Sequence, residues 1–157
     1  KGLIYQVLNL FITQWSQMFF LDVNILIYAF RQDSPNHKKY KSWLEKALVS
    51  PQKIALSHQV LTAFIRITTN KKIFNQPAKL QEAIKFCEIL MSSSNVVVVE
   101  PANGFWAEFK QICTNAKATG NLVQDAFYAA VAIEYGCTMV SADKDFAKFP
   151  KLKTIKV

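Results

Sequence analysis

Three of the 11 acidic residues lie apart from the lysine-rich helical segments where most of the others occur. Asp22 follows the apolar "FFL", Asp125 lies in the first turn of an apolar helical segment, and Asp143 ends "CTMVSAD". In a parallel sheet, Asp22 and Asp143 would project at the carboxyl edge, and Asp125 would reach the same crevice from a neighbouring helix. Helix capping explains any one of them, whereas three acids at such junctions favour a site for Mg²⁺ or Mn²⁺.

The chemistry expected of such a site is hydrolysis of phosphodiesters. A divalent ion held by a few carboxylates lowers the pKa of a bound water and neutralises charge that develops at phosphorus. The net charge of +8 and the pI near 9.4 suit a polyanionic partner, although many basic proteins bind none. No P-loop, GxSxG, GxGxxG or His-Cys cluster offers a competing assignment.

The elements that must position these acids alternate between short apolar strands and amphipathic helices. We expect strands at 19–21, 53–57, 95–100, 137–143 and 152–157, with helices between them. The continuous run "NVVVVE" (95–100) predicts a strand in the middle of the sheet, and Gly120 is predicted to end a helix that starts near Gly104. The pattern predicts an α/β fold with right-handed crossovers and a central parallel sheet of four to five strands.

The composition, the N-terminal segment and the cysteines indicate the domain organisation and the cellular compartment. With 51% hydrophobic residues, we expect one compact domain. Residues 1–17 contain too many polar residues to form a membrane helix or a signal peptide, and we interpret them as an amphipathic extension outside the domain, with Met18 a candidate natural start. Three widely spaced cysteines without a CxxC pair predict buried reduced thiols and a cytoplasmic protein.

The quoted segments resemble a known family. "FLDVNILIYAF", "LTAFIRITTN" and "GNLVQDAFYAAVAIEYGCTMVSADKDFAKFP" are similar to the PIN-domain ribonucleases, in particular the VapC toxins of toxin–antitoxin modules. The resemblance covers residues 19–157 and implies a three-layer PIN domain over 18–157. It implies that Asp22, Asp125 and Asp143 are the catalytic, metal-binding acids of an endoribonuclease that uses Mg²⁺ or Mn²⁺.

The resemblance also assigns the residues around these acids. Asn24 and Ser141 match polar positions that flank the site, and Arg66 matches the arginine of the family's "ExxR" pattern. Asp145 matches the second acid of the "DxDF" turn, either as a further ligand or, as we favour, as a turn-stabilising residue.

Ala63 departs from the family pattern, because a glutamate normally provides a further site acid there. Gln59, one helical turn earlier, could offer only a neutral oxygen. The loss of one carboxylate should weaken metal binding and reduce or abolish turnover. Three explanations are open: natural loss of the acid, a deliberate Glu→Ala change, which we favour because the rest of the site looks intact, or a site that never used four acids.

Two functions from different classes remain. The leading one is a metal-dependent endoribonuclease toxin, and the alternative is a catalytically silent PIN-fold protein that binds RNA or a protein partner. The resemblance implies an RNA substrate, a cognate antitoxin and a homodimer, with no membrane partner. Six basic residues would attract RNA by charge, although solvated surface explains each as well: Lys38, Lys39, Lys41, Arg66, Lys71 and Lys72.

Overall fold

The fold is described for residues 2–4, 6 and 18–157 in a computed structural model of the chain. Most of the predicted amphipathic extension (residues 1, 5 and 7–17) lies outside the described residues. Every helix in the described part of the chain is too short or too polar to cross a lipid bilayer.

Five short strands form one parallel sheet in the order β3-β2-β1-β4-β5. The strands are β1 (Phe19–Leu21), β2 (Ile54–Leu56), β3 (Val96–Val98), β4 (Thr138–Val140) and β5 (Lys153–Ile155). β1 lies at the centre, where Phe20 pairs with Ala55 of β2 on one side and with Met139 of β4 on the other. The predicted α/β fold with a central parallel sheet is confirmed.

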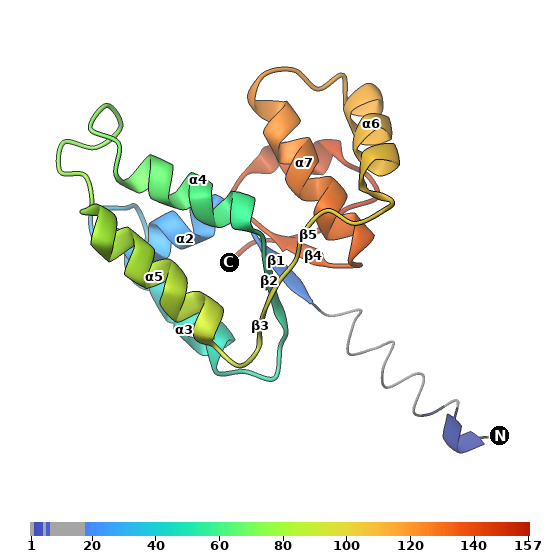
Figure 1. The fold of residues 1–157 in the computed structure, drawn as a ribbon, viewed down its shortest axis with the longest axis horizontal. Helices are drawn as coiled ribbons and strands as arrows, with labels where there is room; N and C mark the ends of the chain where they lie inside the picture. Colours follow the sequence, from blue (N-terminus) through green and yellow to red (C-terminus); the bar gives the residue numbers. More distant parts are fainter. Residues whose placement is uncertain (1, 5, 7–17) are drawn as a thin grey trace.

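Helices cover both faces of the sheet and make a three-layer arrangement (Figure 1). On one side lie α2 (Val23–Phe30), α3 (His37–Leu48), α4 (His58–Thr68) and α5 (Leu80–Ser92), which pack on one another in the pairs α2 with α3, α2 with α4, and α4 with α5. On the other side lie α6 (Phe105–Ala116) and α7 (Asn121–Glu134), and a short 3₁₀ helix, η1 (Lys144–Lys148), follows β4.

The core between these layers explains why α7 can lie close to the sheet. Four alanines of α7 are completely buried: Ala126, Ala129, Ala130 and Ala132. Their small side chains let the helix backbone approach β4 closely, while the bulky Phe20 and Met139 fill the space on the strands. Because α7 is fixed in this way, its first turn is held at the carboxyl edge of the sheet.

Two details of the sequence prediction were wrong. β3 is an edge strand, with Val97 38% exposed, although its run of valines predicted a central one. A β-branched run favours strand conformation but does not determine where the strand lies in the sheet. α6 ends at Ala116, with Lys117 in the left-handed conformation, while Gly120 precedes α7 rather than ending α6.

The cysteines agree with the prediction of reduced thiols. Cys87, Cys113 and Cys137 are all free, with Cys87 and Cys137 buried and Cys113 half-buried. Burial raises the pKa of Cys87 to about 11 and that of Cys137 to about 12. Both thiols therefore stay protonated and unreactive at neutral pH.

One buried amide ties the start of β3 to the segment that leads into β2. The Nδ2 atom of Asn95 lies 2.8 Å from the carbonyl oxygen of Ala47, 3.1 Å from that of Ser50 and 2.7 Å from that of Gln52. The backbone of Asn95 also bonds to the sheet, because its carbonyl oxygen accepts a hydrogen bond from the N–H of Ile54 in β2. The side chain thus provides a donor to the carbonyl groups of Ser50 and Gln52 after α3, whereas the Ala47 carbonyl, inside α3, also accepts from Ser50 Oγ.

We predict that Asn95→Ala lowers the free energy of unfolding by about 2–3 kcal/mol, because it leaves the partly buried carbonyl oxygens of Ser50 and Gln52 without their donor. Urea unfolding followed by circular dichroism measures the change, with Asn115→Ala on the exposed face of α6 as the matched control. Equal stability of the two variants would contradict this role for Asn95.

Candidate active site

Asp22 lies where β1 ends and α2 begins. It is the N-cap of α2, and its Oδ1 accepts a hydrogen bond of 2.7 Å from the backbone N–H of Val23. Its own N–H donates to the carbonyl of Val140, which aligns the ends of β1 and β4. Asp22 is only 3% exposed, and burial is the main reason that its pKa rises to about 6, with the Asp143 charge adding to the increase.

Ser141 connects Asp22 to the segment after β4. The Ser141 hydroxyl donates to Asp22 Oδ2 at 2.6 Å and accepts from Asn24 Nδ2 at 3.2 Å and from the N–H of Asp143 at 2.9 Å. Asn24 Oδ1 in turn accepts from the N–H of Ala142. The predicted flanking residues Asn24 and Ser141 thus form a network that fixes the Asp22 carboxylate relative to the chain that carries Asp143.

Asp125 reaches this edge from the first part of α7. Its carboxyl is half-buried, and its pKa rises to about 6 because of burial and the charges of Asp22, Asp143 and Asp145. The charge of Lys148 lowers the pKa of Asp125 and partly offsets this increase. The charges of Asp22 and Asp143 thus reach Asp125 at the carboxyl edge, and the joint role of the three acids as metal ligands stays a prediction.

Asp143 and Asp145 begin η1. Asp143 is the N-cap, and its Oδ1 accepts from the N–H of Asp145 at 2.8 Å, while Asp145 pairs with Lys148 at 2.8 Å. Carboxylate oxygens of Asp125, Asp143 and Asp145 lie within 4.8 Å of one another; this set does not include Asp22. Asp145 thus lies in the acid cluster and also makes an ion pair within its own turn, so both roles considered for it, further ligand and turn-stabilising residue, stay predictions.

Ala63 and Arg66 lie on α4, which approaches the same edge. Ala63 is buried at 8% exposure and provides no oxygen, and Arg66 is exposed in the last turn. Gln59 Oε1 accepts a 3.2 Å hydrogen bond from Gln124 Nε2, so this oxygen is already engaged with α7. Within the described chain, α4 contributes no carboxylate to the cluster.

Tyr128 is a further residue at this edge that the sequence reasoning missed. Its pKa is raised to about 12, mainly by burial; the charges of Asp22 and Asp125 contribute to the increase, and that of Arg66 opposes it. The phenol therefore lies near both acids and near Arg66. Its position three residues after Asp125 is a helix-spacing signal that could have identified it, because such residues share a helix face.

The cluster suits a hard divalent cation by its donor chemistry. Its ligand atoms would all be carboxylate oxygens, which Mg²⁺ and Mn²⁺ prefer. The raised pKa values of Asp22 and Asp125 show that the carboxylates are crowded and partly desolvated, which is the cost that a bound cation offsets.

Known proteins share both the sequence and the fold. The family model of the PIN domain matches residues 19–152. Ribonuclease VapC25 of Mycobacterium tuberculosis is 33% identical over 139 residues, which are 88% of this chain and 98% of the relative. The VapC ribonuclease Mb2897 of Mycobacterium bovis is 35% identical over 136 residues, 87% of this chain and 92% of the relative.

Solved structures agree on the fold. A chain of VapBC2 from Rickettsia felis, bound to a promoter DNA fragment, superposes with a TM-score of 0.65 at 20% identity, covering 88% of this chain and 98% of that one. VapC20 of Mycobacterium tuberculosis, described as a sarcin-ricin loop cleaving toxin, gives 0.60 at 18% identity, covering 82% and 92%. The chain therefore belongs to the PIN-domain family and, within it, to the VapC ribonucleases.

Proposed function

We propose that the chain is the toxin of a toxin–antitoxin module, an endoribonuclease that uses Mg²⁺ or Mn²⁺ held by Asp22, Asp125, Asp143 and Asp145. The observation that carries the proposal is the group of carboxylates at the carboxyl edge of β1 and β4, three of them with oxygens within 4.8 Å of one another. Nucleases of this family generally depend on a divalent metal. When bound, such an ion activates water and neutralises charge at the scissile phosphate.

Other residues of the site orient its carboxylates or attract the substrate. Ser141 and Asn24 hold the Asp22 carboxylate in one orientation, so that its oxygens are arranged before an ion or a substrate arrives. Arg66, exposed on α4, attracts the phosphate backbone by its charge. We also infer a cognate antitoxin and a homodimer as assemblies of the chain; structural neighbours that are VapBC complexes support the antitoxin.

A second function is favoured by the buried methyl group of Ala63. Without an acid from α4, the chain holds a divalent ion more weakly, and it could act as a catalytically silent protein that still binds RNA or a protein partner. The two functions differ in whether restoring the acid at position 63 produces cleavage.

We predict that Ala63→Glu increases metal-dependent cleavage of single-stranded RNA by about 10- to 100-fold over the chain as it stands, because it adds a carboxylate to the site. Cleavage is followed on gels with Mn²⁺, with Mg²⁺ and with EDTA, which should stop it. Ala107→Glu, on the exposed surface of α6, adds the same charge elsewhere and is the matched control. If Ala63→Glu cleaves no RNA in either metal, the endoribonuclease proposal fails and the binding function is favoured.

We predict that Asp22→Asn stabilises the metal-free chain at pH 7 by up to about 3 kcal/mol, since the folded chain raises the pKa of Asp22 from 3.8 to about 6. A raised pKa means that the folded state binds the proton more tightly. The stability contributed by this group is therefore present below about pH 4 and is lost as the pH rises to about 6.

Urea unfolding in EDTA from pH 4 to pH 7 measures this slope, which Asp22→Asn should reduce and the exposed-acid control Glu45→Gln should keep. Adding Mn²⁺ at pH 7 should raise the melting temperature of the parent chain more than that of Asp22→Asn. An unchanged slope, or equal metal stabilisation of both, would argue against Asp22 as a buried metal ligand.

A further inference from the structure

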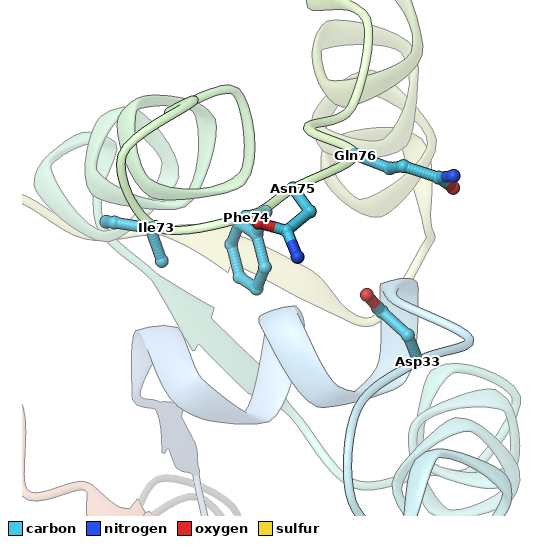
Figure 2. A pocket seen from close by; sticks show the side chains of 5 residues that line it. All are labelled: Asp33, Ile73, Phe74, Asn75 and Gln76. Carbon is cyan, nitrogen blue, oxygen red and sulfur yellow. The ribbon is translucent and has the colours of Figure 1, made fainter.

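A hollow of about 450 Å³ lies away from the acid cluster, between the turn after α2 and the loop that joins α4 to α5. Figure 2 shows the Asp33 carboxylate facing the loop segment that carries Phe74 and Gln76. The buried Arg31 joins the two sides, because its Nη2 donates to Asp33 Oδ2 at 2.6 Å and to the Gln76 carbonyl at 3.1 Å, and its guanidinium carbon lies 3.7 Å from the centroid of the Phe74 ring. These side chains engage one another and hold the loop on α2. A polar group that is free to bind a ligand lies elsewhere, beside the acids.

Tyr128 of α7 carries this group, a hydroxyl on a buried side chain. The residue is only 3% exposed, and its ring packs beside that of Phe20 in β1, with the ring centroids 6.3 Å apart. Within the described part of the chain, its hydroxyl has no hydrogen-bond partner and keeps contact with solvent. By contrast, the hydroxyl of Tyr135, further along the same helix, donates to the Glu100 carbonyl at 2.8 Å. The Tyr128 hydroxyl is therefore available to a ligand.

The direction of α7 places this hydroxyl near the acids. The helix begins at the carboxyl edge of the sheet, and side chains on an α-helix lean toward its N-terminus. Tyr128 comes three residues after Asp125, a rise of about 4.5 Å, so its long side chain reaches back to the level of the Asp125 carboxyl. The charges of Asp22, Arg66 and Asp125 all act on the pKa of the phenol, in agreement with this placement.

The fold itself has no use for a hydroxyl at this place. Burying a polar group without a partner costs free energy, and a phenylalanine would keep the ring contact with Phe20 without this cost. Asp22 does not need the phenol as a donor, because its Oδ1 already accepts from the N–H of Val23 and its Oδ2 from Ser141. These observations favour a role for the hydroxyl in binding a ligand.

An anionic oxygen is the acceptor that suits this donor. The raised pKa keeps the phenol protonated at neutral pH, so that it adds no negative charge to the acids and remains able to donate. A hydrogen bond to a charged oxygen is stronger than one between neutral groups. Arg66, in the last turn of α4, adds a positive charge to the same neighbourhood. The combination of a neutral donor and a cation suits a phosphate.

We propose that the Tyr128 hydroxyl contacts the substrate and donates a hydrogen bond to a non-bridging oxygen of the RNA phosphate at the acid cluster. This inference rests on the proposed ribonuclease function and adds to it a residue that binds the phosphate without carrying a charge. The hydroxyl binds and orients the phosphate, so its loss affects RNA affinity as well as cleavage. The contact forms only when a cation offsets the charge of the acids and lets the phosphate approach.

The test compares Tyr128→Phe with the parent chain, because this change removes only the hydroxyl. Fluorescence anisotropy measures the binding of a labelled single-stranded RNA in Mg²⁺ and in EDTA, and gels check that the RNA is intact. We expect Tyr128→Phe to weaken binding about tenfold in Mg²⁺, through the loss of a hydrogen bond to a charged group, and to leave binding in EDTA unchanged. A purely structural role would change both values alike.

The matched control is Tyr40→Phe, which removes the hydroxyl of another buried tyrosine, packed on Tyr28 away from the acids. It should change RNA binding in neither condition. A second measurement places Tyr128→Phe in the Ala63→Glu background, where we expect kcat/KM for RNA cleavage to fall about tenfold.

The outcomes separate the two proposals. If Tyr128→Phe binds RNA as tightly as the parent in Mg²⁺, or weakens binding equally in EDTA, the phosphate contact is overturned and Ala63→Glu alone decides the ribonuclease proposal. If Ala63→Glu cleaves no RNA but Tyr128→Phe still loses Mg²⁺-dependent binding, the ribonuclease proposal fails and the contact holds for a silent RNA-binding protein. If Mg²⁺ strengthens RNA binding by neither the parent nor Ala63→Glu, the contact is overturned as well.

Discussion

The cost of burying several carboxylates close together at the carboxyl edge of β1 and β4 is the constraint on which the rest of the structure depends. Asp22 and Asp125 both have pKa values raised to about 6, which means that the folded chain keeps them in an environment that disfavours their charge. A protein tolerates such a cost only if other interactions hold the acids in place. Here these are the Ser141 network, the parallel pairing of β1 with β4, and the close packing of α7 on the sheet.

The residue at position 63 affects how many negative charges the site must hold. A glutamate at this buried position would add a further negative charge to acids that already repel one another, so the alanine makes the metal-free fold easier to maintain. Under the proposed function, alanine in place of the family's glutamate also leaves one carboxylate fewer for a cation. Stability without metal and affinity for metal are therefore opposed at this position, and this holds whether the alanine arose naturally or was introduced.

The parts of the fold and site that were predictable from sequence are those with local signals. Alternating apolar strands and helices predicted the parallel sheet, and acids at strand and helix junctions predicted the convergence of Asp22, Asp125 and Asp143. The edge position of β3 was not predictable, because a run of valines reports strand propensity and not neighbours. The hydrogen bond from Arg31 to the Gln76 carbonyl was also not predictable, because it joins residues 45 positions apart and no periodic pattern in the sequence indicates it.

The distribution of charge explains how an acidic cluster can serve a polyanionic substrate. The chain carries a net charge of +8, so its long-range field attracts RNA, yet the cluster itself would repel a phosphate at short range. A divalent cation reverses this local repulsion, and only then does the point of strongest negative charge become a place where phosphate binds. Basic residues away from the cluster, such as Lys71 and Lys72, need no metal to contact the backbone. Under the proposed function, RNA capture and RNA cleavage are thus separable in this chain, and a site with one acid fewer would lose the second before the first.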